Sequence, residues 1–135
     1  MHIQLIRADV TSLKVDAMIN PAQGSQDEVT SGNLFCKFVI HAAVPSSDGD
    51  DADDELDRAT LRALGKAEEL AIASVALPPL WTSPATTERC ARVMIRAAIS
   101  FRSRARSLQR VVFVLFNEEA HNAFERALQA QEALA

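Results

Sequence analysis

Apolar and polar residues follow a strand period in some parts of the chain and a helix period in others. Residues 2–6 alternate between apolar and polar, which predicts a half-buried first strand. Short apolar runs predict more deeply buried strands at 15–19, 35–43, 74–80 and 111–116, with 35–43 as a central one. Apolar residues at helical spacing predict three amphipathic helices, over 54–72, from Thr87 onward and from Asn117 onward. Strands that alternate with helices indicate an α/β fold, here a three-layer α/β/α domain with a mixed, mostly parallel central sheet.

The run at 15–19 differs from the others because it is followed by an amide and a proline, Asn20 and Pro21. Ligands of open α/β folds bind beyond the carboxyl ends of the strands. We therefore expect this strand to deliver polar groups to a ligand-binding rim. Residues 24–27 are polar and too few for a helix, so the chain is expected to cross almost directly to the next strand.

Length and composition fit one globular domain over residues 1–135. The chain is 48% hydrophobic and 24% charged, with a formal net charge of −4, which disfavours a protein that coats nucleic acid but permits a local basic patch. Seven carboxylates lie between Asp48 and Asp57, and seven arginines without an acid lie between Arg89 and Arg110. We expect a solvated acidic loop whose last acids favour the next helix N-terminus, and a solvated basic helix face.

No apolar run is long enough to cross a bilayer, and the first residues lack the pattern of a secretory signal, so we expect a cytoplasmic protein without membrane contact. Cys36 and Cys90 are too isolated for a zinc cluster and are expected to be buried as small hydrophobic residues. His41 stands in an apolar run and is interpreted as a core histidine. We predict no metal site and no cofactor.

Several local patterns also follow one another in a characteristic order. They are Ala8-Asp9-Val10-Thr11, Val15-Asp16-Ala17-Met18-Ile19-Asn20-Pro21-Ala22, Thr30-Ser31-Gly32-Asn33-Leu34, Phe38-Val39-Ile40-His41, Ala76-Leu77-Pro78, Cys90-Ala91-Arg92-Val93-Met94 and Val111-Val112-Phe113-Val114-Leu115-Phe116-Asn117-Glu118-Glu119. Together they resemble the macro domain family, whose members bind ADP-ribose and in some branches hydrolyse ADP-ribosyl esters or O-acetyl-ADP-ribose. The resemblance extends over nearly the whole chain.

The resemblance implies that the adenosine end of a ligand site is present. In the family, the aspartate of a Gly-Asp-Ile-Thr pattern accepts a hydrogen bond from the adenine amino group, and Asp9, with Val10 beside it, holds that place. A carboxylate accepts hydrogen bonds only and so selects an exocyclic amine. Phe116, followed by Asn117, matches an aromatic residue that flanks the adenine. By the residues alone, Asp9 is equally well explained as a turn or capping carboxylate, and a phenylalanine such as Phe116 is more often a core residue than a ligand contact.

The remainder of the resemblance is interrupted. Asn20 matches the first asparagine of the Asn-Ala-Ala-Asn signature, but Gln23 stands at the second, and the glycine-rich loop, aspartate and helix that follow in the family are missing. A second, glycine-containing phosphate loop is replaced by Trp81-Thr82-Ser83-Pro84, where proline removes a backbone donor. Asn20, Thr82 and Ser83 are the ligand contacts that remain on this side. We predict no catalytic residue and expect binding rather than hydrolysis.

Three hypotheses follow. The first is a module that binds ADP-ribose or another adenine nucleotide. The second is a degenerate macro domain that self-associates, as a homodimer through the sheet face that a missing helix exposes, or binds a protein partner without nucleotide. The third, less favoured, is nucleic-acid binding through the arginine-rich segment at Arg102, Arg104, Arg106 and Arg110.

Overall fold

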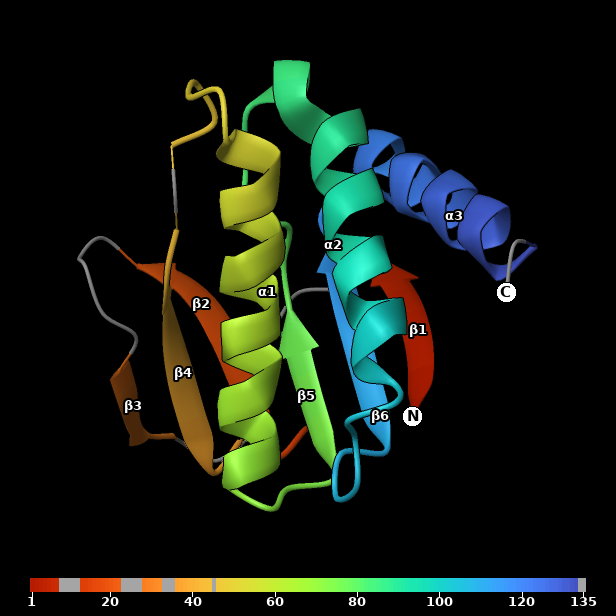
Figure 1. The fold of residues 1–135 in the computed structure, drawn as a ribbon. Coiled ribbons are helices and arrows are strands. Elements are labelled where there is room, and N and C mark those ends of the chain that lie inside the picture. The colour runs from red at the N-terminus through yellow and green to blue at the C-terminus, as the bar shows by residue number, and fades with distance from the viewer. Residues whose placement is uncertain (8–12, 23–27, 33–35, 45, 134–135) are drawn as a thin grey trace.

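Six strands form one mixed sheet in the computed structural model, which describes residues 1–7, 13–22, 28–32, 36–44 and 46–133 (Figure 1). The order across the sheet is β1-β6-β5-β2-β4-β3, and only the β3–β4 pair is antiparallel. The strands are β1 (His2–Arg7), β2 (Ala17–Ala22), β3 (Glu28–Ser31), β4 (Phe38–Ala43), β5 (Ser74–Leu77) and β6 (Arg110–Leu115). The predicted mixed, mostly parallel sheet is confirmed.

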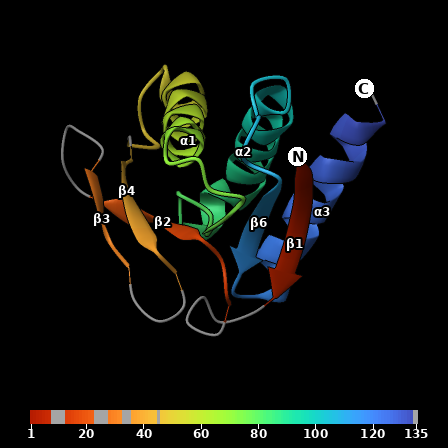
Figure 2. The same cartoon turned by 90° about the horizontal axis from the view of Figure 1, so that it is seen from below.

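All three helices lie on the same face of the sheet (Figure 2). They are α1 (Ala52–Glu69), α2 (Thr87–Phe101), which a short 3-10 turn, η2 (Pro84–Thr86), precedes, and α3 (Glu118–Glu132). Their apolar stripes pack on alternate residues of the strands, because successive strand residues point to opposite faces. The rings of Phe113 on β6 and Phe124 on α3, for example, have centroids 5.3 Å apart. The largest part of the core therefore lies between the sheet and this single helix layer.

The opposite face of the sheet carries a smaller apolar cluster. Its buried members are Val15, Cys36, Ala76, Val112 and Val114. The three-layer prediction placed helices on this face as well. Within the described ranges, no helix covers it. Because the cluster is buried by the chain itself, the face does not offer these side chains to a second copy. A homodimer through this face stays a prediction.

The strand and helix boundaries differ from the sequence expectations by a few residues. β2 extends to Ala22 rather than ending at 19, and β4 begins at Phe38 rather than 35. β4 is an interior strand, as predicted, because it pairs with β2 on one side and with β3 on the other. α1 covers 52–69 rather than 54–72. β5 ends at Leu77 instead of residue 80, because the two prolines that follow it have no N–H group for strand pairing.

Asp16 joins the start of β2 to both neighbouring strands. Its backbone carbonyl accepts hydrogen bonds from the N–H groups of Lys37 (2.8 Å) and Phe38 (3.2 Å) at the start of β4. Its carboxylate Oδ2 accepts from the N–H groups of Ala73 (3.0 Å) and Ser74 (3.1 Å) at the start of β5. One residue thus sets the relative position of three strands at the amino end of the sheet.

We expect Asp16→Ala to lower the free energy of unfolding by about 1–2 kcal/mol, because two backbone N–H groups lose a charged acceptor. Asp16→Asn keeps an acceptor oxygen in place and should lose less. Urea unfolding at neutral pH measures both changes. Wild-type stability in the alanine variant would show that water replaces the carboxylate at no cost.

Candidate functional site

A cleft opens at the carboxyl ends of β2 and β5 because the two strands separate there. β2 pairs with β4 along its full length, but with β5 only through Ala17 and Met18. Beyond these residues, Pro21 on β2 and the Pro78-Pro79 pair after β5 cannot donate backbone hydrogen bonds across the gap. The prolines therefore explain why the sheet splays at this end.

The cleft has a volume of about 520 Å³, within the usual range for a small-molecule site. Its described lining contains no charged side chain. The lining residues are Met18, Asn20, Pro21, Pro78, Pro79, Trp81, Thr82, Thr87, Phe116, Asn117, Ala120 and Phe124. A few amides and hydroxyls among mostly apolar side chains suit a largely neutral, flat ligand with several polar atoms.

Phe116 forms one wall of the cleft and is 63% exposed. It is one of two large apolar side chains, with Val29, that stand exposed in the part of the chain described. Phe116 follows the last residue of β6 and precedes Asn117, whose Oδ1 accepts a hydrogen bond from the Ala120 N–H at 2.8 Å and caps α3. The change from strand to helix therefore leaves Phe116 outside both elements, with its ring turned to the cleft.

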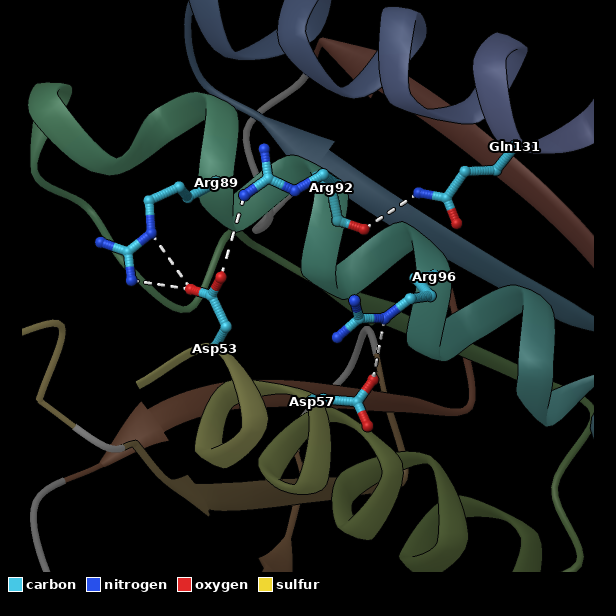
Figure 3. A network of polar contacts seen from close by, with 6 residues as sticks. All are labelled: Asp53, Asp57, Arg89, Arg92, Arg96 and Gln131. Atoms are coloured by element: carbon cyan, nitrogen blue, oxygen red, sulfur yellow. Dashed lines mark hydrogen bonds and ion pairs between the residues drawn. The ribbon is translucent and has the colours of Figure 1, made fainter. Parts of the chain in front are cut away.

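Trp81 forms part of another wall and is only 6% exposed. The guanidinium carbon of Arg89 lies 5.2 Å from the Trp81 ring centroid, a distance typical of a cation–π contact. Arg89 in turn donates two hydrogen bonds to Asp53 Oδ1, at 2.7 and 3.1 Å (Figure 3). The position of Trp81 is thus linked to the first turn of α1.

The acidic and basic segments that were predicted to be solvated meet each other along α1 and α2 (Figure 3). Besides its bonds to Arg89, Asp53 lies 3.8 Å from Arg92, and Asp57 lies 3.7 Å from Arg96. The last acids lie in the first turn of α1, as expected, and the ion pairs with α2 arise because helix packing places these acids opposite the arginines of α2. Their half-exposed side chains still limit each pair to a small stabilisation, about 0–1 kcal/mol.

The loop between β5 and α2 is tied to α2 by a backbone donor. The Leu80 N–H donates to Met94 Sδ at 3.3 Å. Burial raises the pKa of the Cys90 thiol to about 11, and hydrogen bonds from the backbone of Trp81 and Leu80 oppose this rise. The Leu80 N–H therefore lies on the buried side of the loop.

The cleft brings together four of the seven residues predicted as ligand contacts: Asn20, Thr82, Phe116 and Asn117. Ser83 is exposed and is not among the described lining residues, and its carbonyl accepts hydrogen bonds from the Thr86 N–H (3.0 Å) and Oγ1 (2.9 Å). Asp9 and Val10 lie outside the described residues. Sequence reasoning did not predict that Pro21, Pro78, Pro79 and Thr87 line the cleft. Their positions close to strand ends were the signal that could have found them.

The other candidate residues lie elsewhere. Cys36 and Cys90 are buried and free, as predicted. His41 is half-buried on β4, and its Nε2 lies 3.0 Å from Thr30 Oγ1, so it has a hydrogen-bonding partner. Within the described residues no group of three or more His, Cys, Asp or Glu side chains is placed to hold a metal ion, and no helix is long and apolar enough to cross a membrane.

The arginine-rich segment is partly engaged by the protein itself. Arg102 donates a hydrogen bond to Glu132 at 2.6 Å, and Arg104 lies 5.4 Å from the ring centroid of Phe101. These contacts join the end of α2 to α3 and to the core. The segment follows the end of α2 at Phe101 and so forms no helix face, and its role in nucleic-acid binding stays an untested hypothesis.

The fold is similar to that of solved macrodomains. A structure titled Oceanobacillus iheyensis macrodomain with ADP matches with a TM-score of 0.83 at 16% sequence identity, covering 97% of this chain and 92% of that one. A mutant of the same macrodomain with ADPR matches with a TM-score of 0.82 at 16% identity, covering 96% of this chain and 92% of that one. At this identity the likeness concerns the fold alone.

Sequence comparison identifies longer relatives. An uncharacterized protein of Mycobacterium tuberculosis is 30% identical over 167 residues, covering 98% of this chain but 46% of the relative, so the chain spans less than half of that protein. An uncharacterized protein of Saccharolobus solfataricus is 28% identical over 164 residues, covering 93% of this chain and 91% of the relative. Both alignments exceed the 135 residues of the chain, so the relatives carry segments that it lacks.

Five residues, 23–27, separate β2 from β3, and the loss of a loop and helix at this place stays a prediction. A family model described as Macro domain matches residues 14–94, more than half of the chain. The chain, a shortened form beside these relatives, belongs to the macro domain family.

Proposed function

We propose that the cleft binds ADP-ribose or a related adenine nucleotide and that the chain acts as a binding module rather than a hydrolase. The proposal is supported by the position of the cleft at the carboxyl ends of parallel strands, where α/β folds hold ligands. The solved macrodomains with ADP or ADPR share this fold. No side chain of the described lining titrates near neutral pH, so a general acid or base would have to come from another segment.

The observation that carries the proposal is the exposed ring of Phe116 beside the cleft. An aromatic side chain that is 63% exposed leaves a large apolar area in water, which stacking against a base would remove. Stacking of a base on an aromatic residue contributes about 1–3 kcal/mol in single-strand binders. The polar atoms of Asn20, Thr82 and Asn117 surround the same space and suit ribose and base edges.

We therefore expect Phe116→Ala to weaken ADP-ribose binding by about 5-fold to 150-fold, the ratio that corresponds to the lost stacking. Isothermal titration calorimetry on the wild type and the variant measures the change. Val29→Ala is the matched control, because it also shortens an exposed apolar side chain but lies on β3 at the far edge of the sheet.

Absence of heat with the wild type at millimolar ADP-ribose would reject the proposal. Equal affinities of the wild type and Phe116→Ala would leave nucleotide binding intact but would place the base elsewhere. Circular dichroism of all three proteins verifies that the fold is unchanged.

A further inference from the structure

We propose that a groove beside α1, which we call the α1 groove, binds the phosphodiester backbone of a nucleic-acid strand. The groove has a volume of about 390 Å³ and is lined by residues of α1 and of the segment that follows α2. Four of the lining side chains carry a positive charge: Arg58, Arg62 and Lys66 on α1, and Arg104 on the other segment. The α1 groove shares no described lining residue with the cleft, so this inference does not depend on the proposed function.

Positive charge is concentrated in the α1 groove. Its described lining holds the four cations and one carboxylate, that of Glu69, although the chain as a whole has a formal net charge of −4. Glu69 faces the last cation of the row, Lys66, at 3.7 Å. Arg58, Arg62 and Lys66 follow one another at intervals of four residues, and like charges at this spacing weaken a helix. An anion that lies along the row would relieve this repulsion.

The arrangement of the cations suits a linear polyanion. Four residues of an α-helix advance by about 6 Å, so the three cations of α1 extend over about 12 Å along the axis. Such a row can follow successive phosphates of a strand, whereas a compact anion requires cations that converge on one point. Arginine, which supplies three of the four charges, binds phosphate through paired N–H groups. Phosphate contacts carry no sequence information, so we expect binding to be independent of base sequence.

The protein itself holds the wall opposite the row in place. The Arg104 N–H donates to the Phe101 carbonyl at 2.8 Å, and the Arg104 guanidinium carbon lies 5.4 Å from the Phe101 ring centroid. Two residues further along, the Arg106 N–H donates to the carboxylate of Glu68 on α1 at 2.7 Å. These contacts join the segment to α1 before a ligand arrives. Less ordering of the groove is therefore needed on binding.

Gly65 leaves space in the α1 groove. It lies within α1, where glycine is less favourable than alanine because it loses more backbone freedom on folding. A Cβ at this position would meet no atom outside the local helix backbone within 4 Å, so packing within the protein does not require a glycine here. Glycine does allow a ligand to approach the backbone closely. A longer side chain would occupy the space into which we place the strand.

The test is fluorescence anisotropy with a labelled single-stranded oligothymidylate over a range of salt concentrations. Contacts with about four phosphates predict a slope of log K against log salt near −3, since each contact on a single strand contributes about −0.7. Arg58→Gln should reduce the size of this slope by about 0.7. It should also weaken binding about tenfold, the ratio that corresponds to one charge-assisted hydrogen bond.

Two further variants separate the groove from a general attraction of charges. Arg126→Gln is the matched control, because it removes the same charge from α3, on the other side of α2 from α1 (Figure 2). Its affinity and slope should equal those of the wild type. Gly65→Gln fills the groove without changing the charge, and we expect it to weaken binding about fivefold or more. Urea unfolding should show that Gly65→Gln is at least as stable as the wild type, since glutamine is the better helix former.

Failure of the wild type to bind at low salt would overturn the inference, as would binding that does not respond to salt. Equal weakening by Arg58→Gln and Arg126→Gln, or unchanged binding by Gly65→Gln, would place the strand outside the α1 groove. An oligoglutamate of the same charge that binds as tightly as the oligothymidylate would also overturn it, because the groove would then recognise an acidic peptide rather than phosphate.

Discussion

Replacement of Phe124 with alanine is expected to lower the free energy of unfolding by about 3–5 kcal/mol, the usual loss for truncation of a fully buried phenylalanine. The side chain is 0% exposed, packs on Phe113 at a centroid distance of 5.3 Å, and belongs to the main core. Only Phe124 and Ala123 of α3 are fully buried, so Phe124 is the main apolar anchor of this helix. The large cavity left by alanine should therefore weaken attachment of α3 as well as overall stability.

Chemical denaturation measures the loss, with Leu128→Ala as the control on the same helix. Leu128 is only partly buried against the core, so its truncation should cost clearly less than that of Phe124. Phe124→Leu should recover most of the stability, because it restores apolar volume. A loss for Phe124→Ala no larger than for Leu128→Ala would contradict the central role of this contact.

The second large effect is expected at Glu68, near the end of α1. Its carboxylate accepts hydrogen bonds from the backbone N–H groups of Arg106 (2.7 Å), Ser107 (2.9 Å) and Leu108 (3.2 Å), in the segment that leads into β6. Glu68→Ala leaves three donors without this acceptor. Because the carboxylate is partly exposed, water replaces some of these bonds, and we expect a total loss of about 2–3 kcal/mol rather than that amount for each bond.

These hydrogen bonds also predict a pH dependence. The backbone N–H groups of Arg106 and Ser107 lower the pKa of Glu68 from 4.5 to about 2. A carboxyl whose pKa is lower in the folded state stabilises the protein above its unfolded pKa and loses that contribution as the pH falls through the folded pKa. The stability difference between the wild type and Glu68→Gln should thus be full near neutral pH and disappear from about pH 5 to about pH 2.

Urea unfolding of the two proteins across this pH range measures the difference. Glu69→Gln is the matched control, because this neighbouring carboxylate makes only an exposed ion pair with Lys66 at 3.7 Å. A constant difference between the wild type and Glu68→Gln over the whole range would show that the charge of Glu68 is not what holds the segment.

Hydrophobic periodicity and the order of short motifs determined the class of the fold and the family, because both depend on local residue patterns. The buried runs became strands, and Asn117 caps the last helix as predicted. Four predicted ligand residues, among them Asn20 and Phe116, line the cleft, since strand ends in a parallel sheet meet at one rim.

Contacts between distant segments were decided only by the tertiary structure. The acids near Asp53 and the arginines of α2 each resembled a solvated segment, and they became partners because two helices pack side by side. By residue type Phe116 was expected in the core, yet the transition from β6 to α3 leaves it exposed at the cleft. The inward direction of the Leu80 N–H group depends on the Met94 sulfur of α2, which no local pattern in the loop reveals. Side-chain type and spacing thus determined the strands, the helices and the rim of the sheet where the cleft lies. Packing determined which side chains and backbone groups remain available to a ligand.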